Sequence, residues 1–140
     1  MKRVLIAALL MLTALPALAQ RPPLSTLWVG HWFGSGQTGD RSQMFIDTFN
    51  PDGSFRALHR ACVQGKATDK SQIGSWRING NILTINMTAV NGEPRSYEDR
   101  YRIDAVDGKT QDYTLVANNF PYKSRKVDGK FQMPPCDLVS

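Results

Sequence analysis

Apolar and polar residues alternate along most of the chain, as they do in β-strands with one buried and one solvated face. The segment Ile82–Ala89 is typical, because Leu83, Ile85 and Met87 fall on one side and polar residues on the other. After residue 19, no segment keeps a helical apolar period over several turns. We therefore expect about eight strands. They lie near Trp28–Gly34, Gln43–Phe49, Ser54–Cys62, Ile73–Ile78, Ile82–Ala89, Ser96–Val106, Gln111–Ala117 and Tyr122–Val127, with Lys130–Met133 as an optional continuation.

Turn signals separate these segments. Asn-Gly and Asp-Gly pairs tolerate the positive φ angles of tight hairpins. Such turns are predicted at Asp52-Gly53, Gln64-Gly65, Asn79-Gly80, Asn91-Gly92, Asp107-Gly108 and Asp128-Gly129. Two longer polar stretches, Gly34–Ser42 and Gly65–Gln72, are predicted to be mobile loops, and Pro23–Leu27 a short helical turn.

The alternation also assigns faces and an architecture. Tyr97, Tyr101, Ile103 and Ala105 share one face of their strand, as do Tyr113, Leu115 and Ala117 in the next. Antiparallel strands joined in sequence order form an up-and-down meander, and closure of the meander removes its unpaired edges. We predict an all-β fold, an antiparallel meander that closes into a small barrel. An open sandwich is the alternative.

The first 19 residues resemble a cleavable secretory signal. Lys2 and Arg3 precede the apolar run Val4–Leu15, and Ala17 and Ala19 are the small residues that a signal peptidase reads. A run of about 12 residues is short of the ~20 that span a bilayer, although an uncleaved anchor is the alternative. We predict cleavage before Gln20, a single domain over residues 20–140, no membrane span in the mature chain, and a periplasmic or secreted location.

The charge pattern and the cysteine content limit which partners and cofactors we expect. The net charge is +5, but basic and acidic residues are interleaved and form no dense basic run, so we expect no nucleic-acid partner. Cys62 and Cys136 are the two cysteines of the chain. An even count in an exported protein predicts one disulfide between them, and their spacing is poor for a metal site. We predict no metal and no cofactor.

Two stretches carry a family resemblance. The opening Gly30-His31-Trp32 resembles the Gly-x-Trp start of lipocalin-like and other calycin barrels. The turn Asn50–Gly53 and the segment Gly74–Leu83 resemble small bacterial lipocalin-like domains. The resemblance implies a barrel with a tryptophan packed across its closed end and a small ligand at the open end. The chain is shorter than true lipocalins and shows no C-terminal helix, and Trp32 and Trp76 could equally be plain core.

A small set of residues is predicted to bind that ligand. His59 alternates with Phe55 and Ala57, and Asp99 lies between two inward tyrosines, where it needs a partner such as Tyr113 or His59. A few convergent polar groups among aromatic side chains are typical of ligand pockets, although a structural polar network would look the same. The predicted ligand-binding residues are Trp76, Tyr97, Tyr101, Tyr113, His59 and Asp99.

No catalytic motif stands out, because the serines lack a Gly-x-Ser-x-Gly context and no glycine-rich loop opens a helix. We therefore favour a binding protein for a small apolar or amphipathic molecule. The first alternative is a periplasmic inhibitor or protein-interaction module that acts through the two polar loops. The second is a hydrolase or isomerase in the barrel mouth. A filled interior favours inhibition, an apolar cavity favours carriage, and clustered titratable groups favour catalysis.

Overall fold

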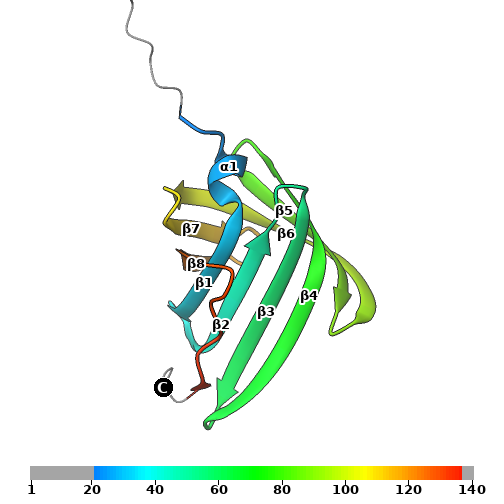
Figure 1. Ribbon diagram of the computed structural model, residues 1–140, viewed down its shortest axis with the longest axis vertical. Coiled ribbons are helices and arrows are strands. Elements are labelled where there is room, and N and C mark those ends of the chain that lie inside the picture. The colour runs from blue at the N-terminus through cyan, green and yellow to red at the C-terminus, as the bar shows by residue number, and fades with distance from the viewer. Residues whose placement is uncertain (1–20, 137–140) are drawn as a thin grey trace, which may run out of the picture.

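The computed structural model describes residues 21–136, so the predicted signal and its cleavage site lie outside the described residues. One short helix, α1 (Leu24–Trp28), precedes eight strands (Figure 1). Each strand pairs antiparallel with the next, and β8 pairs with β1, so the sheet is a closed barrel. The predicted all-β up-and-down barrel is confirmed. The strands are β1 (Gly30–Gln37), β2 (Asp40–Phe49), β3 (Ser54–Val63), β4 (Lys66–Asn79), β5 (Ile82–Val90), β6 (Glu93–Val106), β7 (Thr110–Leu115) and β8 (Phe120–Val127).

The hairpin turns follow the predicted glycine chemistry. Gln64 and Gly65 join β3 to β4 with φ angles of 51° and 73°, and Asn91 and Gly92 join β5 to β6 with 51° and 80°. Two consecutive residues with positive φ match the right-handed twist of the flanking strands. These two-residue turns fix the register of the long hairpins.

Both predicted mobile loops are wrong. Only Thr38 and Gly39 separate β1 from β2, and the stretch Gly65–Gln72 belongs almost entirely to β4. A bidentate pair stabilises this polar part of β4, since the Arg60 guanidinium donates to both carboxylate oxygens of Asp69 at 2.6 and 2.7 Å. These segments are polar because their side chains are mostly exposed beyond the core, and not because they lack strand structure.

Two further face assignments are wrong, because β6 contains a bulge and β7 ends early. A bulge between Ile103 and Ala105 shifts the register with β7, so Ile103 is buried and Ala105 exposed. Strand β7 ends at Leu115, which leaves Ala117 exposed in the turn. Residues 130–133 form no strand, so the optional continuation of the last strand is also wrong.

The end of the barrel next to α1 is filled with aromatic side chains. Trp28 and Trp32 have no exposed surface, and the Trp32 indole donates to the Trp28 carbonyl at 2.8 Å. Trp76 donates its indole N–H to the Asn50 carbonyl at 2.9 Å and packs edge-on against Phe49. The Gly-x-Trp tryptophan and Trp76 therefore belong to the core of the closed end.

The barrel closes through a short seam. Strands β1 and β8 pair over three residues only, and the Gln37 side chain extends this ladder by exchanging two hydrogen bonds with the backbone of Lys123 at 2.7 and 2.8 Å. A Cβ on Gly34 would lie 2.2 Å from the Phe45 ring and 2.9 Å from the Lys123 carbonyl, so the seam tolerates only glycine there.

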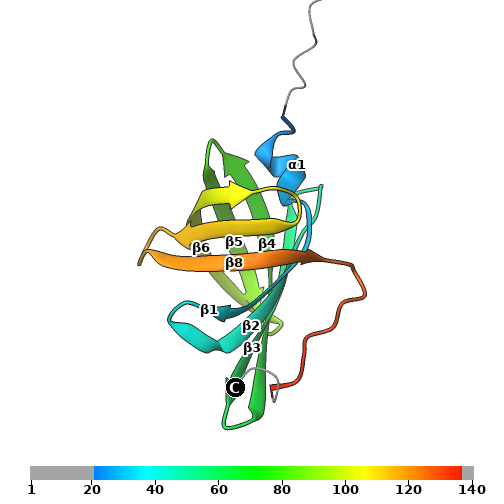
Figure 2. The same cartoon turned by 90° about the vertical axis from the view of Figure 1, so that its left-hand side faces the viewer.

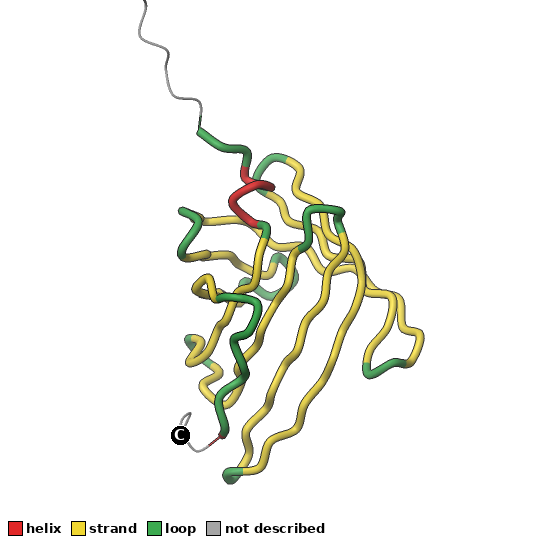
Figure 3. Tube along the Cα trace, in the orientation of Figure 1, coloured by secondary structure: helices red, strands yellow, loops and turns green. Residues whose placement is uncertain are grey.

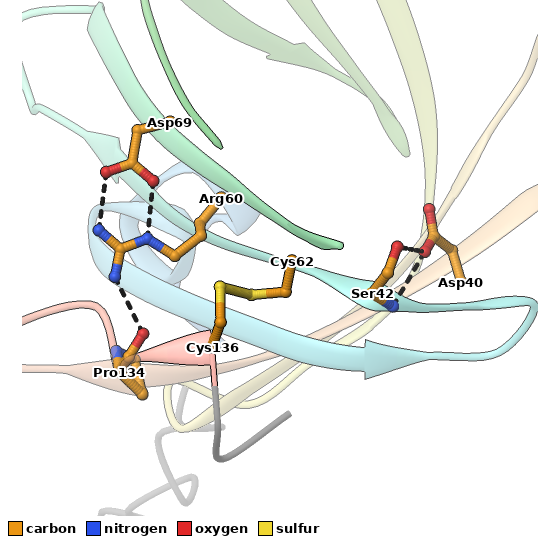
Figure 4. The surroundings of a disulfide bond; sticks show 7 residues. All are labelled: Asp40, Ser42, Arg60, Cys62, Asp69, Pro134 and Cys136. Carbon is orange, nitrogen blue, oxygen red and sulfur yellow. Dashed lines mark hydrogen bonds and ion pairs between the residues drawn. A yellow bond between two sulfur atoms is a disulfide. The ribbon is translucent and has the colours of Figure 1, made fainter. Parts of the chain in front are cut away.

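The C-terminal segment leaves β8 and runs along the outside of the barrel to the tip of the β3–β4 hairpin (Figures 1 and 2), as a loop (Figure 3). There Cys62 and Cys136 are paired as a disulfide, with their Cα atoms 5.4 Å apart (Figure 4). The Arg60 guanidinium, held by Asp69, also donates to the Pro134 carbonyl at 3.0 Å. The tail is thus attached at its end by one covalent and one polar contact.

Candidate ligand cavity

A cavity of about 210 Å³ lies inside the barrel, and its lining comes from the seven strands β2 to β8. Most of its residues belong to the halves of these strands that are far from α1, because Phe49, Trp76 and Trp28 fill the other end. A larger depression of about 480 Å³ lies beside Phe33 and Arg125, but it is a shallow groove on the outer surface. The interior cavity is therefore the candidate site.

Five of the six predicted ligand-binding residues line this cavity. They are Tyr97, Tyr101, Tyr113, His59 and Asp99. Trp76 does not line it, because its indole is held in the closed-end core by Asn50. The β-strand alternation therefore placed these five side chains on the inner face of the barrel.

All four tyrosines of the chain meet in the cavity, including Tyr122, which is not among the predicted site residues. Tyr113 and Tyr122 are opposite each other in the β7–β8 ladder and stack with ring centroids 5.4 Å apart. Tyr101 packs edge-on against both, at 5.5 Å from Tyr113 and 6.0 Å from Tyr122. Tyr122 is half-buried, and its strand alternates it with the buried Ser124, an inward position that the polar serine did not reveal in the sequence.

The surroundings disfavour ionisation of these hydroxyls. Burial, and then the negative charge of Asp47, raise the pKa of Tyr113 and Tyr122 above the ordinary value. Burial, and then Asp99, raise the pKa of Tyr97 and Tyr101. The tyrosines stay neutral and can both donate and accept hydrogen bonds.

Asp47 on β2 is the second residue that the predictions missed. It is 8 % exposed and lines the cavity. Its carboxylate accepts no hydrogen bond from the residues that the structure describes, and His59 Nε2 lies 3.7 Å from Oδ1, beyond hydrogen-bonding distance. The signal was available, because Asp47 alternates with Phe45 and Phe49 on an inward face.

Asp99 lies nearer the open end, and its environment differs from the prediction. Burial raises the pKa of Asp99, while the positive charge of Lys70 and a hydrogen bond from Tyr101 oppose that rise. Neither expected partner, Tyr113 or His59, forms a hydrogen bond with Asp99, and the His59 Nε2 lies 3.7 Å from Asp47 instead. The expectation was wrong because the sequence does not show which of the inward side chains from different strands meet across the barrel.

Gln72 contributes a further unpartnered acceptor. Its amide Nε2 donates to the Tyr97 hydroxyl, whereas Oε1 is buried and has no partner among the described residues. The cavity wall thus combines tyrosine rings and the apolar side chains of Phe45, Ile85 and Met87 with polar groups that lack partners. The lining agrees with the expected set of aromatic side chains with a few polar groups, and adds Asp47 and Gln72 to the polar ones.

Within residues 21–136, no group of three or more His, Cys, Asp or Glu side chains could hold a metal ion. No helix in the same range is long and apolar enough to cross a membrane.

The structure defines a class of protein: a closed, eight-stranded up-and-down barrel with one filled end and a cavity toward the other, the architecture of lipocalin-like proteins. It is similar to a lipocalin-like protein from Bacteroides uniformis, with 16% identity, a TM-score of 0.46, and coverage of 72% of this chain and 99% of that chain. It is also similar to an uncharacterized protein from Bacteroides eggerthii, with 16% identity, a TM-score of 0.47, and coverage of 71% and 99%. No family model and no curated protein matches the chain. At this identity the similarity says nothing of ligand or activity.

Proposed function

We propose that this protein is an exported barrel that binds one small amphipathic molecule inside its cavity. The observation that carries the proposal is the 210 Å³ cavity, in which four tyrosines surround polar groups that have no hydrogen-bond partner among residues 21–136. Concave sites with aromatic walls and a few convergent polar groups are typical of ligand pockets. Export is supported by the signal-like residues 1–19 and by the disulfide, because such bonds persist in oxidising compartments.

The size of the cavity limits the ligand. Pockets for drug-sized molecules are roughly 300 Å³ or more, and an apolar cavity of about 150 Å³ in another protein holds one benzene molecule. A cavity of 210 Å³ therefore suits a single ring with a short substituent. A long-chain lipid would not fit within this volume and would have to extend through the open end.

A second candidate function is catalysis at the same place, and the cluster of titratable groups favours it. Asp47 lies 3.7 Å from His59, and Asp99 and Lys70 line the same cavity. A carboxylate that orients a histidine is a common arrangement in general-base catalysis. The separation is longer than a hydrogen bond, which is why binding is the first proposal.

The inhibitor alternative has less support. It relied on two mobile loops, and these segments are strands and a tight turn. An exposed apolar residue close to these segments is Val63 at the tip of the β3–β4 hairpin, which is 64 % exposed.

Native mass spectrometry of the oxidised protein, purified without denaturation from cells that express it, tests the proposal. We expect a bound molecule of low mass that is released on unfolding. Leu115→Trp places a large ring at the cavity wall and should abolish retention, whereas Val116→Trp, at the neighbouring half-exposed position, should not.

If both variants retain the molecule equally, it does not occupy the cavity and the proposal fails. Incubation with the identified molecule separates the two functions. A binding protein returns the added ligand unchanged, whereas a hydrolase returns products of different mass and an isomerase returns a product of the same mass with a different chromatographic retention time.

A further inference from the structure

The buried acceptors in the cavity indicate the chemical class of the ligand. Asp47 Oδ1 and Gln72 Oε1 are both buried and have no hydrogen-bond donor among residues 21–136. Asp47 is 8 % and Gln72 5 % exposed, and both line the cavity. A buried acceptor without a donor is costly, and a buried carboxylate without one is more costly still. Both acceptors require donors that these residues of the protein do not supply.

The charges around the cavity are unequally placed. Asp47 lies among the tyrosines, whereas the cation Lys70 is an exposed residue of β4 whose charge acts on Asp99. The nearest cationic candidate to Asp47 is His59, whose Nε2 is 3.7 Å away and does not form a hydrogen bond. An anionic ligand would meet the Asp47 carboxylate, and a neutral hydrocarbon would leave it without a donor.

The tyrosines around Asp47 favour a cation. Tyr101, Tyr113 and Tyr122 surround this part of the cavity with ring separations of 5.4 to 6.0 Å. The negative faces of aromatic rings attract organic ammonium groups, most strongly where water is excluded. Neutral tyrosine hydroxyls can also accept from an N–H donor.

Building on the proposed function, we propose that the ligand is a small organic amine, bound as the ammonium ion, whose N–H groups donate to Asp47 and Gln72 while its apolar ring lies against the tyrosines. Asp47 is thereby the specificity-determining residue of the cavity. The buried Oδ1 of Asp47, which has no hydrogen-bond donor, is a cost to the free protein that the ammonium group of the ligand removes.

Three probes of one ring size but different charge test this inference. They are 2-phenylethylamine, the neutral 2-phenylethanol and the anion 3-phenylpropanoate, each titrated into the oxidised protein by calorimetry. We expect the amine to bind most tightly, and Asp47→Asn to weaken it by roughly 10- to 100-fold, the value of a hydrogen bond to a charged group. Asp112→Asn is the matched control, because it removes the same charge from the outer face of β7, where Asp112 pairs with Lys123.

A second readout is the thermal stability of the ligand-free variants. If the Asp47 carboxylate destabilises the protein until a cation binds, Asp47→Asn raises Tm relative to wild type and to Asp112→Asn. If Asp47 has a structural role alone, the same change lowers Tm.

The outcomes distinguish this inference from the proposed function. Equal binding of alcohol and amine, tighter binding of the anion, or unchanged amine binding by Asp47→Asn overturns the amine assignment but leaves a ligand-binding cavity. Failure of the amine to bind also overturns the assignment. If, in addition, neither other probe binds and native mass spectrometry finds only the bare protein, the proposed function fails as well.

Discussion

The end of the barrel next to α1 is filled by aromatic side chains, whereas the other half encloses a cavity of about 210 Å³. At the filled end, the indoles of Trp32 and Trp76 donate to backbone carbonyls. The Trp28 indole N–H and the Gln111 Nε2, both buried outside the cavity lining, have no partner among the described residues. In the cavity half, a carboxylate and an amide oxygen lack donors. The comparison indicates that aromatic packing at the filled end stabilises the fold, whereas polar groups in the other half face a cavity.

Truncation of the closed-end core gives the largest expected effect. Trp32→Ala should lower the free energy of unfolding by about 3–5 kcal/mol, because a fully buried indole and its hydrogen bond to Trp28 are lost. Urea denaturation followed by circular dichroism measures it. A loss below ~1 kcal/mol would show that this end is not the main source of stability.

Removal of the disulfide comes next. The bridge spans 74 positions, for which the chain-entropy model gives about 4 kcal/mol. The Cys62→Ser/Cys136→Ser double variant should therefore unfold at lower urea concentration. Ligand binding at saturating concentration should be retained, because neither cysteine lines the cavity. Loss of binding in a variant that is still folded would mean that the tail shapes the site.

The loss of stability at alkaline pH should come from the tyrosines in the cavity half of the barrel. The pKa values of all four tyrosines are raised in the folded protein, mainly by burial. Unfolded tyrosines release their protons near pH 10, before the folded ones do, so their contribution is complete below about pH 10 and is lost as the pH rises further. Ultraviolet absorbance of tyrosinate should lag behind that of the urea-unfolded chain. Coincident titration curves would contradict the clustered arrangement.

The smallest expected effect has the opposite sign. In the absence of ligand, Asp47→Asn should stabilise the protein by about 1 kcal/mol, because it replaces a buried charge that lacks a donor. Differential scanning calorimetry against Asp112→Asn measures the difference. A lower Tm for Asp47→Asn alone would assign Asp47 to the structural network.

Local patterns predicted the barrel and most of its interior. The positions of Tyr97, Tyr101 and Tyr113 follow from alternation within a strand, which needs no knowledge of the neighbouring strand. The same rule applied to Phe45, Asp47 and Phe49 would have found the carboxylate that the prediction omitted.

Features that depend on how two strands pair could not be predicted from the sequence. The bulge at Ile103 and Ala105 exposes an alanine that strict alternation places inside, and bulges leave no clear local mark. The polar start of β4 looks like a loop because its side chains are exposed and show no apolar alternation, and the pairing of Asp69 with Arg60 across the β3–β4 hairpin is not visible in one strand alone. Trp76 also alternates inward, but its depth along the barrel, next to Asn50, decides that it is core and not cavity wall.

Two-dimensional NMR of aromatic and indole groups during titration with 2-phenylethylamine tests whether the amine occupies the interior cavity. We expect shifts of the four tyrosine ring signals, with little change at the indole N–H groups of Trp32 and Trp76 in the filled end. Shifts confined to the outer groove beside Phe33, or no shifts at saturating amine, would contradict it.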